Sequence, residues 1–165
     1  MEVTREEVSL ERELQSLLNG REKRISVCFV CTGNTCRSPM AEAMLKHLGG
    51  GAYKVCSAGV SAVTGDKITV NAVKALKKAG IPSTPENNYE AHEARMIDAA
   101  IMDENDMIVA ITENHMLNLL LSFPEYADKI SVMPKDIPDP FMFGEAVYDR
   151  CLEEITACIK EKFGL

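Results

Sequence analysis

Segments of strand type alternate with segments of helical type from residue 25 to the C-terminal end of the chain. Short apolar runs rich in β-branched and aromatic residues predict buried strands, and runs bounded by capping residues and glycines predict helices. Parallel strands need crossover connections, and right-handed crossovers place helices on both faces of a sheet. The predicted strands are 25–30, 53–57, 107–111 and 129–133. The predicted helices are 39–48, 69–79, 112–121 (or 114–121) and 145–162, with a further helical turn near 91–96.

This alternation predicts the α/β class, as a single-domain three-layer sandwich whose four-stranded parallel sheet has the order 2-1-3-4. A chain of 165 residues has an ordinary size for one domain. Residues 1–24 form a charged N-terminal extension that we expect to be helical or mobile, and residues 25–165 form the domain. The apolar residues of the extension fall at roughly helical spacing, and they are Val8, Leu10, Leu14, Leu17 and Leu18.

The charge balance restricts the partners. The chain has 18 Lys and Arg against 25 Asp and Glu, a net charge of −7. This balance argues against salt-dependent binding to nucleic acid or to an anionic membrane. No apolar run approaches the roughly 20 residues that span a bilayer, and the N-terminus is charged, unlike a signal peptide. We therefore expect a cytoplasmic protein that binds any anion through a local site.

The cysteines indicate neither a disulfide framework nor a metal site. A chain of this length does not need disulfides, and several of the cysteines lie inside apolar runs, so most are expected to be reduced and structural. No second cluster of Cys or His accompanies the nearest pair, so we expect no metal and no cofactor. The six cysteines are Cys28, Cys31, Cys36, Cys56, Cys151 and Cys158.

The strongest functional signal lies where the first strand passes into a helix. Ligands of parallel α/β sheets bind beyond the carboxyl ends of the strands. Backbone N–H groups that converge at a helix N-terminus bind anions, and Gly and Asn tolerate the left-handed backbone that such a loop requires. The Gly-Lys-Ser/Thr ending of a Walker loop is absent. The predicted phosphate-binding loop runs from Cys31 to Arg37 through Thr32, Gly33, Asn34, Thr35 and Cys36, followed by Ser38 and Pro39.

Cys31 and Arg37 have complementary chemistry at such a site. The positive environment favours the thiolate of Cys31, which makes it a nucleophile. The planar fork of Arg37 matches two phosphate oxygens and stabilises charge in the transition state. Ser38 either donates its hydroxyl to the thiolate or caps the helix that follows, with Pro39 at its first position. Taken alone, Cys31 could equally be a buried structural cysteine in a turn, but the whole string favours the nucleophile.

These residues resemble the low-molecular-weight protein tyrosine phosphatases, whose signature is Cys-x-Gly-Asn-x-Cys-Arg-Ser-Pro after the first strand. The resemblance covers roughly residues 25–162, so it implies a phosphatase domain over 25–165, and residues 1–24 lie outside it. Besides the loop, it rests on Ser57-Ala-Gly59, on the stretch 71–81, on His92-Glu-Ala-Arg95 and on Asp139-Pro-Phe141.

The resemblance implies a two-step, metal-independent reaction on a phosphorylated protein or peptide. Cys31 takes the phosphoryl group, Asp139 protonates the leaving atom, and Asp139 then guides water to release inorganic phosphate. It also implies that Asn34 is locked by hydrogen bonds with Ser57 and His92. From the residues alone, His92 reads more readily as a surface residue.

Asp139 taken alone would be an ordinary turn residue before a proline. Two prolines stiffen its loop, and Phe141 and Phe143 could form a wall that partly dries the site, which favours a protonated acid. Asp136 is the competing acid and lacks the Pro-aromatic pair that follows Asp139.

Thr35 bears on the substrate. Tyrosine phosphatases of this family usually carry a bulky aliphatic residue there, and a threonine resembles the branch that removes phosphate from arginine. A hydroxyl on the pocket wall can orient water or a guanidinium group, although a threonine can also merely fit the loop. We therefore expect Thr35 and Phe141 at the substrate rim, phosphoarginine as the first candidate substrate and phosphotyrosine as the alternative.

Two other classes are remoter alternatives. Arsenate reductases resemble this loop, but they typically have Gln after the loop serine and two further redox cysteines in mid-chain, whereas this chain has Pro39 and no cysteine between Cys56 and Cys151. A non-catalytic phosphate-binding module would lack the nucleophile or the acid. In relatives, the positions of Cys31 and Cys36 can form a reversible disulfide, so a protective disulfide is a further hypothesis.

Overall fold

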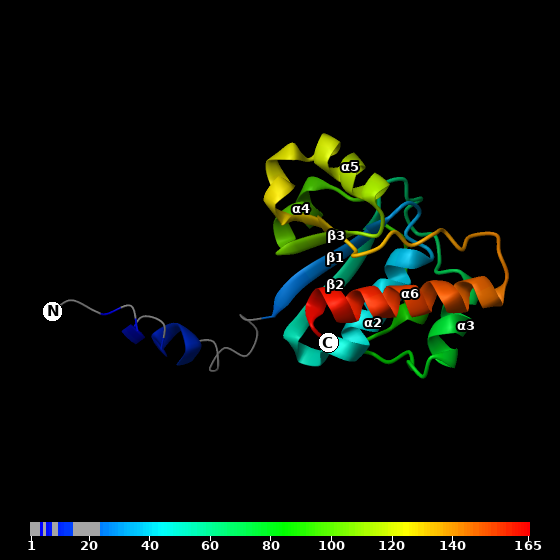
Figure 1. Ribbon diagram of the computed structural model, residues 1–165, viewed down its shortest axis with the longest axis horizontal. Helices are drawn as coiled ribbons and strands as arrows, with labels where there is room; N and C mark the ends of the chain where they lie inside the picture. Colours follow the sequence, from blue (N-terminus) through cyan, green and yellow to red (C-terminus); the bar gives the residue numbers. More distant parts are fainter. Residues whose placement is uncertain (1–3, 5, 8–9, 15–23) are drawn as a thin grey trace.

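A four-stranded parallel sheet lies at the centre of the computed structural model, which describes residues 4, 6–7, 10–14 and 24–165 (Figure 1). The strand order is β2-β1-β3-β4, so the predicted order 2-1-3-4 is confirmed. All three neighbouring pairs are parallel. The strands are β1 (Ile25–Cys31), β2 (Tyr53–Gly59), β3 (Met107–Ala110) and β4 (Ile130–Val132).

Helices cover both faces of this sheet, as the right-handed crossovers require (Figure 1). Three helices pack on one face: α2 (Arg37–Gly49), α3 (Val70–Lys78) and α6 (Glu145–Phe163). Two pack on the other: α4 (Ala99–Glu104) and α5 (Glu113–Ser122). Short 3-10 turns complete the chain: η1 (Gly50–Ala52), η2 (Tyr89–Ala91) and η3 (Pro124–Lys129).

The central strand β1 divides its side chains between the two layers. Val27, Phe29 and Cys31 belong to the core beneath α2, α3 and α6, whereas Cys28 and Val30 belong to the core beneath α4 and α5. This alternation follows from the pleat of a strand that is buried on both faces. It places Cys31, the last residue of β1, on the same side of the sheet as α2.

Two predicted helical features are wrong. The helical turn expected near 91–96 lies earlier in the chain, as the 3-10 turn that ends at Ala91, and residues 93 and 96 form isolated bridges with Lys67 and Gly59 instead. The helix of this region is α4, which begins after Asp98, whose Oδ1 accepts the N–H of Ile101 at 2.8 Å.

The predicted cap of α2 is also wrong. That helix begins at Arg37, so Ser38 lies inside its first turn and makes no cap hydrogen bond. Its hydroxyl lies instead beside Cys31 and Asn34. The alternative role considered for Ser38, as a partner of the cysteine sulfur, is therefore the one that the geometry allows.

Only part of the N-terminal extension is described. Residues 6–7 and 10–14 are helical, and Leu10 and Leu14 are exposed. Val8, Leu17 and Leu18, the other apolar positions of the predicted amphipathic helix, lie outside the described residues. Among the helices that are described, none has both the length and the apolar character needed to cross a bilayer.

Candidate active site

The loop between β1 and α2 lies at the carboxyl end of the sheet, where parallel α/β folds bind ligands. Asn34 has a left-handed backbone (φ 57°), which lets the chain wrap between the strand and the helix. Gly59 at the end of β2 packs against this wrap. A methyl group there would overlap the carbonyl oxygen of Thr32 and lie 3.1 Å from the amide nitrogen of Asn34, so only glycine fits.

The sulfur of Cys31 is buried at the base of the loop, with its Sγ 2.9 Å from Ser38 Oγ. Ser38 Oγ accepts a hydrogen bond from Asn34 Nδ2 at 2.8 Å, so its own proton can be donated to Cys31 Sγ or to the carbonyl oxygen of Ala58, which lies 3.4 Å away. The hydrogen bonds of Ser38 thus connect the cysteine sulfur to the buried side chain of Asn34.

The guanidinium of Arg37 is buried beside the loop and is held by protein oxygens. Its Nη1 donates to the carbonyl oxygen of Ile137 at 3.0 Å, and its Nη2 lies 3.5 Å from Thr32 Oγ1 and 3.8 Å from Asp139 Oδ2. A guanidinium held in this way can offer its remaining N–H groups to two phosphate oxygens without reorganisation.

A buried hydrogen-bond network centres on Asn34, whose side chain is fully buried. Asn34 Nδ2 also donates to Ser57 Oγ at 3.0 Å, and its Oδ1 accepts the backbone N–H of Arg95 at 3.0 Å. His92 Nε2 donates to the carbonyl oxygen of Asn34 at 2.8 Å. The structure thus brings together Asn34, Ser57 and His92. Every polar group of the asparagine side chain has a partner, which fixes the loop.

Glu42 joins the same network, although the sequence reading did not single it out. Ser57 Oγ donates to Glu42 Oε1 at 2.7 Å, and Glu42 Oε2 accepts from Lys46 Nζ at 2.7 Å. Glu42 lies in α2 one turn beyond Ser38, so its position in the first turns of a helix after the phosphate loop was the available signal.

Asp139 lies across from the loop, and its carboxylate is positioned by its own backbone turn. Its Oδ1 accepts the N–H of Phe141 at 3.0 Å, and its side chain is 53% exposed. Phe141 and Phe143 are exposed too, so the expectation that they dry the acid is wrong. The loop turns outward here, with Met142 at a positive φ of 73°.

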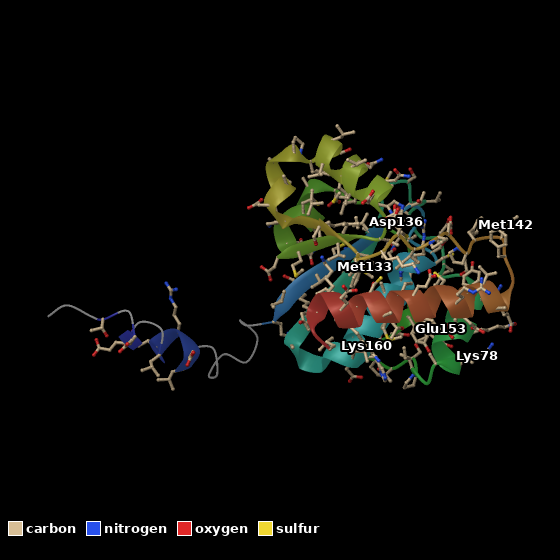
Figure 2. The ribbon with its side chains drawn as sticks, in the orientation of Figure 1. Lys78, Met133, Asp136, Met142, Glu153 and Lys160 are labelled. Atoms are coloured by element: carbon tan, nitrogen blue, oxygen red, sulfur yellow. The ribbon has the colours of Figure 1, made fainter. Side chains whose placement is uncertain are left out.

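The competing acid, Asp136, has another task. Its Oδ1 accepts the N–H of Glu113 at 2.9 Å, so it satisfies one of the free N–H groups at the start of α5. Figure 2 labels Met133, Asp136 and Met142 along the segment that leads from β4 to α6. Asp136 lies near the β4 end of this segment and Met142 near the α6 end.

A cavity of about 520 Å³ opens above the sulfur of Cys31. Thr35 lies on its wall together with Phe141, and two carboxylates, Asp66 and Asp139, border it. The sequence reading missed Asp66, which lies in a loop with no motif to mark it. The other lining residues are Cys31, Thr32, Gly33, Cys36, Arg37, Ser61, Val63, Lys67 and Thr69.

Cys36 faces away from water and towards α6. Its Sγ lies 3.2 Å from Tyr148 Oη and 3.5 Å from Thr69 Oγ1. Burial and the hydrogen bond with Cys36 raise the pKa of Tyr148 to about 12. All six cysteines are free thiols, so Cys31 and Cys36 are not joined in this structure.

His115 is a buried residue of the site that the sequence reading missed. Its Nε2 lies 2.9 Å from Thr32 Oγ1, and its Nδ1 lies 3.0 Å from Thr112 Oγ1. Burial and the nearby positive charge of Arg37 lower the pKa of His115 to about 4, so the imidazole is neutral near pH 7. A histidine two residues into a helix that starts at the carboxyl end of a strand was the available signal.

No group of three or more His, Cys, Asp or Glu side chains is placed to hold a metal ion in the part of the chain that the structure describes.

Comparison with known proteins agrees with this geometry. The family described as "Low molecular weight phosphotyrosine protein phosphatase" matches residues 26–163. A protein-arginine-phosphatase of Geobacillus stearothermophilus is 35% identical over 140 residues, which are 81% of this chain and 90% of the relative. An arsenate reductase of Bacillus cereus is 31% identical over 140 residues, which are 85% of this chain and 95% of the relative.

A solved structure of an arginine phosphatase from Geobacillus stearothermophilus superposes with a TM-score of 0.75 at 33% identity and covers 85% of this chain and 93% of its own. The fold, the loop and the matched family agree over the same residues. The chain therefore belongs to the low-molecular-weight phosphotyrosine protein phosphatase family and is a cysteine-dependent protein phosphatase.

Proposed function

We propose that this phosphatase hydrolyses phosphoarginine in proteins through a phosphocysteine intermediate, without a metal, and that it acts in the cytoplasm. The observation that carries the mechanism is the position of Cys31 Sγ, which lies 2.9 Å from Ser38 Oγ at the base of a cavity that Arg37 and Asp139 also line.

In the first step, the thiolate of Cys31 attacks phosphorus and forms an S–P bond while the bond from phosphorus to the leaving nitrogen breaks. The backbone N–H groups of the loop and the guanidinium of Arg37 stabilise the oxygens of the transferring phosphoryl group. Asp139, as a carboxylic acid, gives its proton to the leaving nitrogen, so the positively charged arginine side chain departs as a guanidinium ion and not as a neutral guanidine.

In the second step, water attacks the same phosphorus. The carboxylate of Asp139 accepts a proton from that water, and the S–P bond breaks with its electron pair returning to Cys31. The products are inorganic phosphate and the regenerated thiolate. Because Asp139 is exposed beside the cavity, water reaches it without a conformational change.

Two features of the cavity support phosphoarginine. Thr35 places a small polar side chain on the wall instead of an aliphatic one, which leaves room for a planar guanidinium. The carboxylate of Asp66, which borders the cavity, favours a substrate that carries positive charge next to its phosphate. Lys67 also borders the cavity and is paired with Glu93 at 2.8 Å.

Phosphotyrosine is the alternative substrate, and one observation favours it. Phe141 lines the cavity, and its exposed ring could stack on a phenol ring. An arsenate reductase remains the more distant alternative, because the chain has no cysteine between Cys56 and Cys151 to carry electrons to a second thiol.

The test measures phosphate release from matched phosphoarginine and phosphotyrosine peptides by the wild type, Thr35→Ile and Cys31→Ser. We expect the wild type to prefer phosphoarginine, Thr35→Ile to shift the ratio of kcat/KM towards phosphotyrosine by about tenfold or more, and Cys31→Ser to be inactive on both. Selectivity that Thr35→Ile leaves unchanged would contradict the arginine assignment. Turnover that survives Cys31→Ser would contradict the mechanism.

A further inference from the structure

Thr32, His115 and Thr112 form a continuous chain of hydrogen bonds that starts at the buried guanidinium. Arg37 Nη2 donates to Thr32 Oγ1 at 3.5 Å, Thr32 Oγ1 lies 2.9 Å from His115 Nε2, and His115 Nδ1 lies 3.0 Å from Thr112 Oγ1. These hydrogen bonds connect the phosphate loop to the N-terminal cap of α5, and the two elements are far apart in sequence.

A neutral imidazole can complete this set of hydrogen bonds in either tautomer. It has one N–H donor and one acceptor nitrogen, and a hydroxyl group can both donate and accept. Thr32 Oγ1 accepts from Arg37, and Thr112 Oγ1 accepts the backbone N–H of His115 at 3.3 Å, so each hydroxyl still has a proton and a lone pair to offer to the ring. His115 therefore orients the Thr32 hydroxyl in both tautomers.

The charges around His115 are consistent with this arrangement. Arg37 disfavours the imidazolium, whereas Asp136 and Asp139 favour it, and burial decides the balance for the neutral form. His115 is buried and both of its ring nitrogens have partners, so the ring orientation is fixed.

The same nitrogen of Arg37 faces the proposed acid. Nη2 lies 3.5 Å from Thr32 Oγ1 and 3.8 Å from Asp139 Oδ2, so the two oxygens compete for this nitrogen. Thr32 belongs to the phosphate loop, and its hydroxyl, oriented by His115, offers the guanidinium a partner on that loop.

We propose that His115 is a positioning residue for phosphoryl transfer, which acts through Thr32 to hold the guanidinium of Arg37 in its phosphate-binding orientation. This inference rests on the proposed role of Arg37 in catalysis and does not depend on which phosphorylated side chain is the substrate. It assigns a task to a buried histidine that the two-step reaction itself does not use.

The test is a double-mutant cycle of Thr32→Val and His115→Phe, with para-nitrophenyl phosphate as substrate. Because a hydrogen bond to a charged group is lost, each variant should lower kcat about tenfold while KM changes less than about threefold. The double variant should also lose about tenfold, because both changes break one chain. His115→Gln can still reach Thr32 and should recover kcat to within about threefold of the wild type.

Thr64→Val and His47→Gln are matched controls at exposed positions that do not line the cavity, and both should retain wild-type kcat. Turnover of para-nitrophenyl phosphate by the wild type tests the phosphatase activity itself, separately from the role of His115. Thr32 is exposed, so Thr32→Val is informative even if His115→Phe fails to fold. Losses that multiply to about a hundredfold in the double variant, or an unchanged kcat in Thr32→Val, would overturn the proposal.

Discussion

Segment 31–38 buries its functional side chains, whereas segment 136–144 exposes most of its own. Four side chains of the first segment are buried, namely Cys31, Asn34, Arg37 and Ser38. Within this segment, Ser38 Oγ accepts a hydrogen bond from Asn34 and lies within hydrogen-bond distance of Cys31 Sγ. Asp139 is held only by its own turn and by a 3.8 Å approach to Arg37. In the proposed mechanism, anion binding therefore uses a rigid, preorganised loop, whereas proton transfer uses an exposed one.

This difference has a physical reason. The nucleophile and the anion site must be in place before substrate arrives, since reorganisation at the moment of reaction is costly. The acid must meet a bulky leaving group and then a water molecule, which requires access from solvent. We therefore expect substitutions in segment 31–38 to damage stability and chemistry together, and those in segment 136–144 to damage chemistry alone.

The largest difference in kcat should be found between substitutions of the two aspartates of segment 136–144. Asp139→Asn removes the proton donor and should lower kcat by about 100-fold or more on a substrate with a poor leaving group. Asp136→Asn keeps an oxygen that can accept the N–H of Glu113, so kcat should stay within about twofold of the wild type. A larger loss from Asp136→Asn would reverse the assignment of the acid.

The pH dependence of stability should reveal the buried histidine beside the rigid loop. Its pKa is lowered from 6.5 to about 4, so the unfolded chain binds a proton before the folded one does. The contribution of His115 to the free energy of unfolding is therefore fully present above about pH 6.5. As the pH falls towards 4, this contribution is lost, by about 3 kcal/mol in total. Urea unfolding measured from pH 7 to pH 4 should show that the free energy of unfolding falls less steeply with pH for His115→Gln than for the wild type. The same pH dependence in both proteins would count against a buried neutral imidazole.

Asn34 tests whether the rigid loop also stabilises the fold. Asn34→Ala removes the acceptor of the Arg95 N–H and forces a left-handed backbone on alanine. It should therefore lower the free energy of unfolding by about 2–3 kcal/mol. Asn34→Gly loses the same hydrogen bonds but tolerates the backbone, and should cost about 1 kcal/mol less. Asn118→Ala, on the exposed face of α5, is the control and should not destabilise. Equal stability of all three would show that the loop is not locked.

The smallest effect on stability is expected at Phe141. Phe141→Ala should change the unfolding free energy by less than about 0.5 kcal/mol, because the ring is half exposed. KM for a peptide substrate should rise by about threefold, since the ring lines the cavity. Leu121→Ala, at an exposed position outside the cavity, should alter neither quantity. A large loss of stability would remove the contrast between the two segments.

The parts of the molecule that follow local rules could be predicted from the sequence. The α/β class and the strand order are confirmed, because apolar β-branched runs separated by capped helices leave few other arrangements. The loop from Cys31 to Arg37 could be located because its residue types and spacing are tied to one kind of chemistry.

The remainder depends on tertiary contacts that leave little trace in the sequence. Residues 93 and 96 form isolated bridges with Lys67 and Gly59, which are distant in sequence, and α4 is too short to show a clear period. The role of Ser38 depends on the sulfur that lies beside it after folding. No motif marks His115 in the sequence, and only the packing of α5 against the phosphate loop brings it to Thr32.

The central claim is that Cys31 carries the phosphoryl group between the two steps. With para-nitrophenyl phosphate, whose leaving group departs without an acid, Asp139→Asn should slow the second step more than the first, so the variant can be mixed with this substrate, quenched in acid and digested for mass spectrometry. We predict the mass of one phosphoryl group on the peptide that contains Cys31, and its absence after Cys31→Ser. A phosphoryl group on any other residue, or a burst of leaving group with no labelled cysteine, would contradict the account.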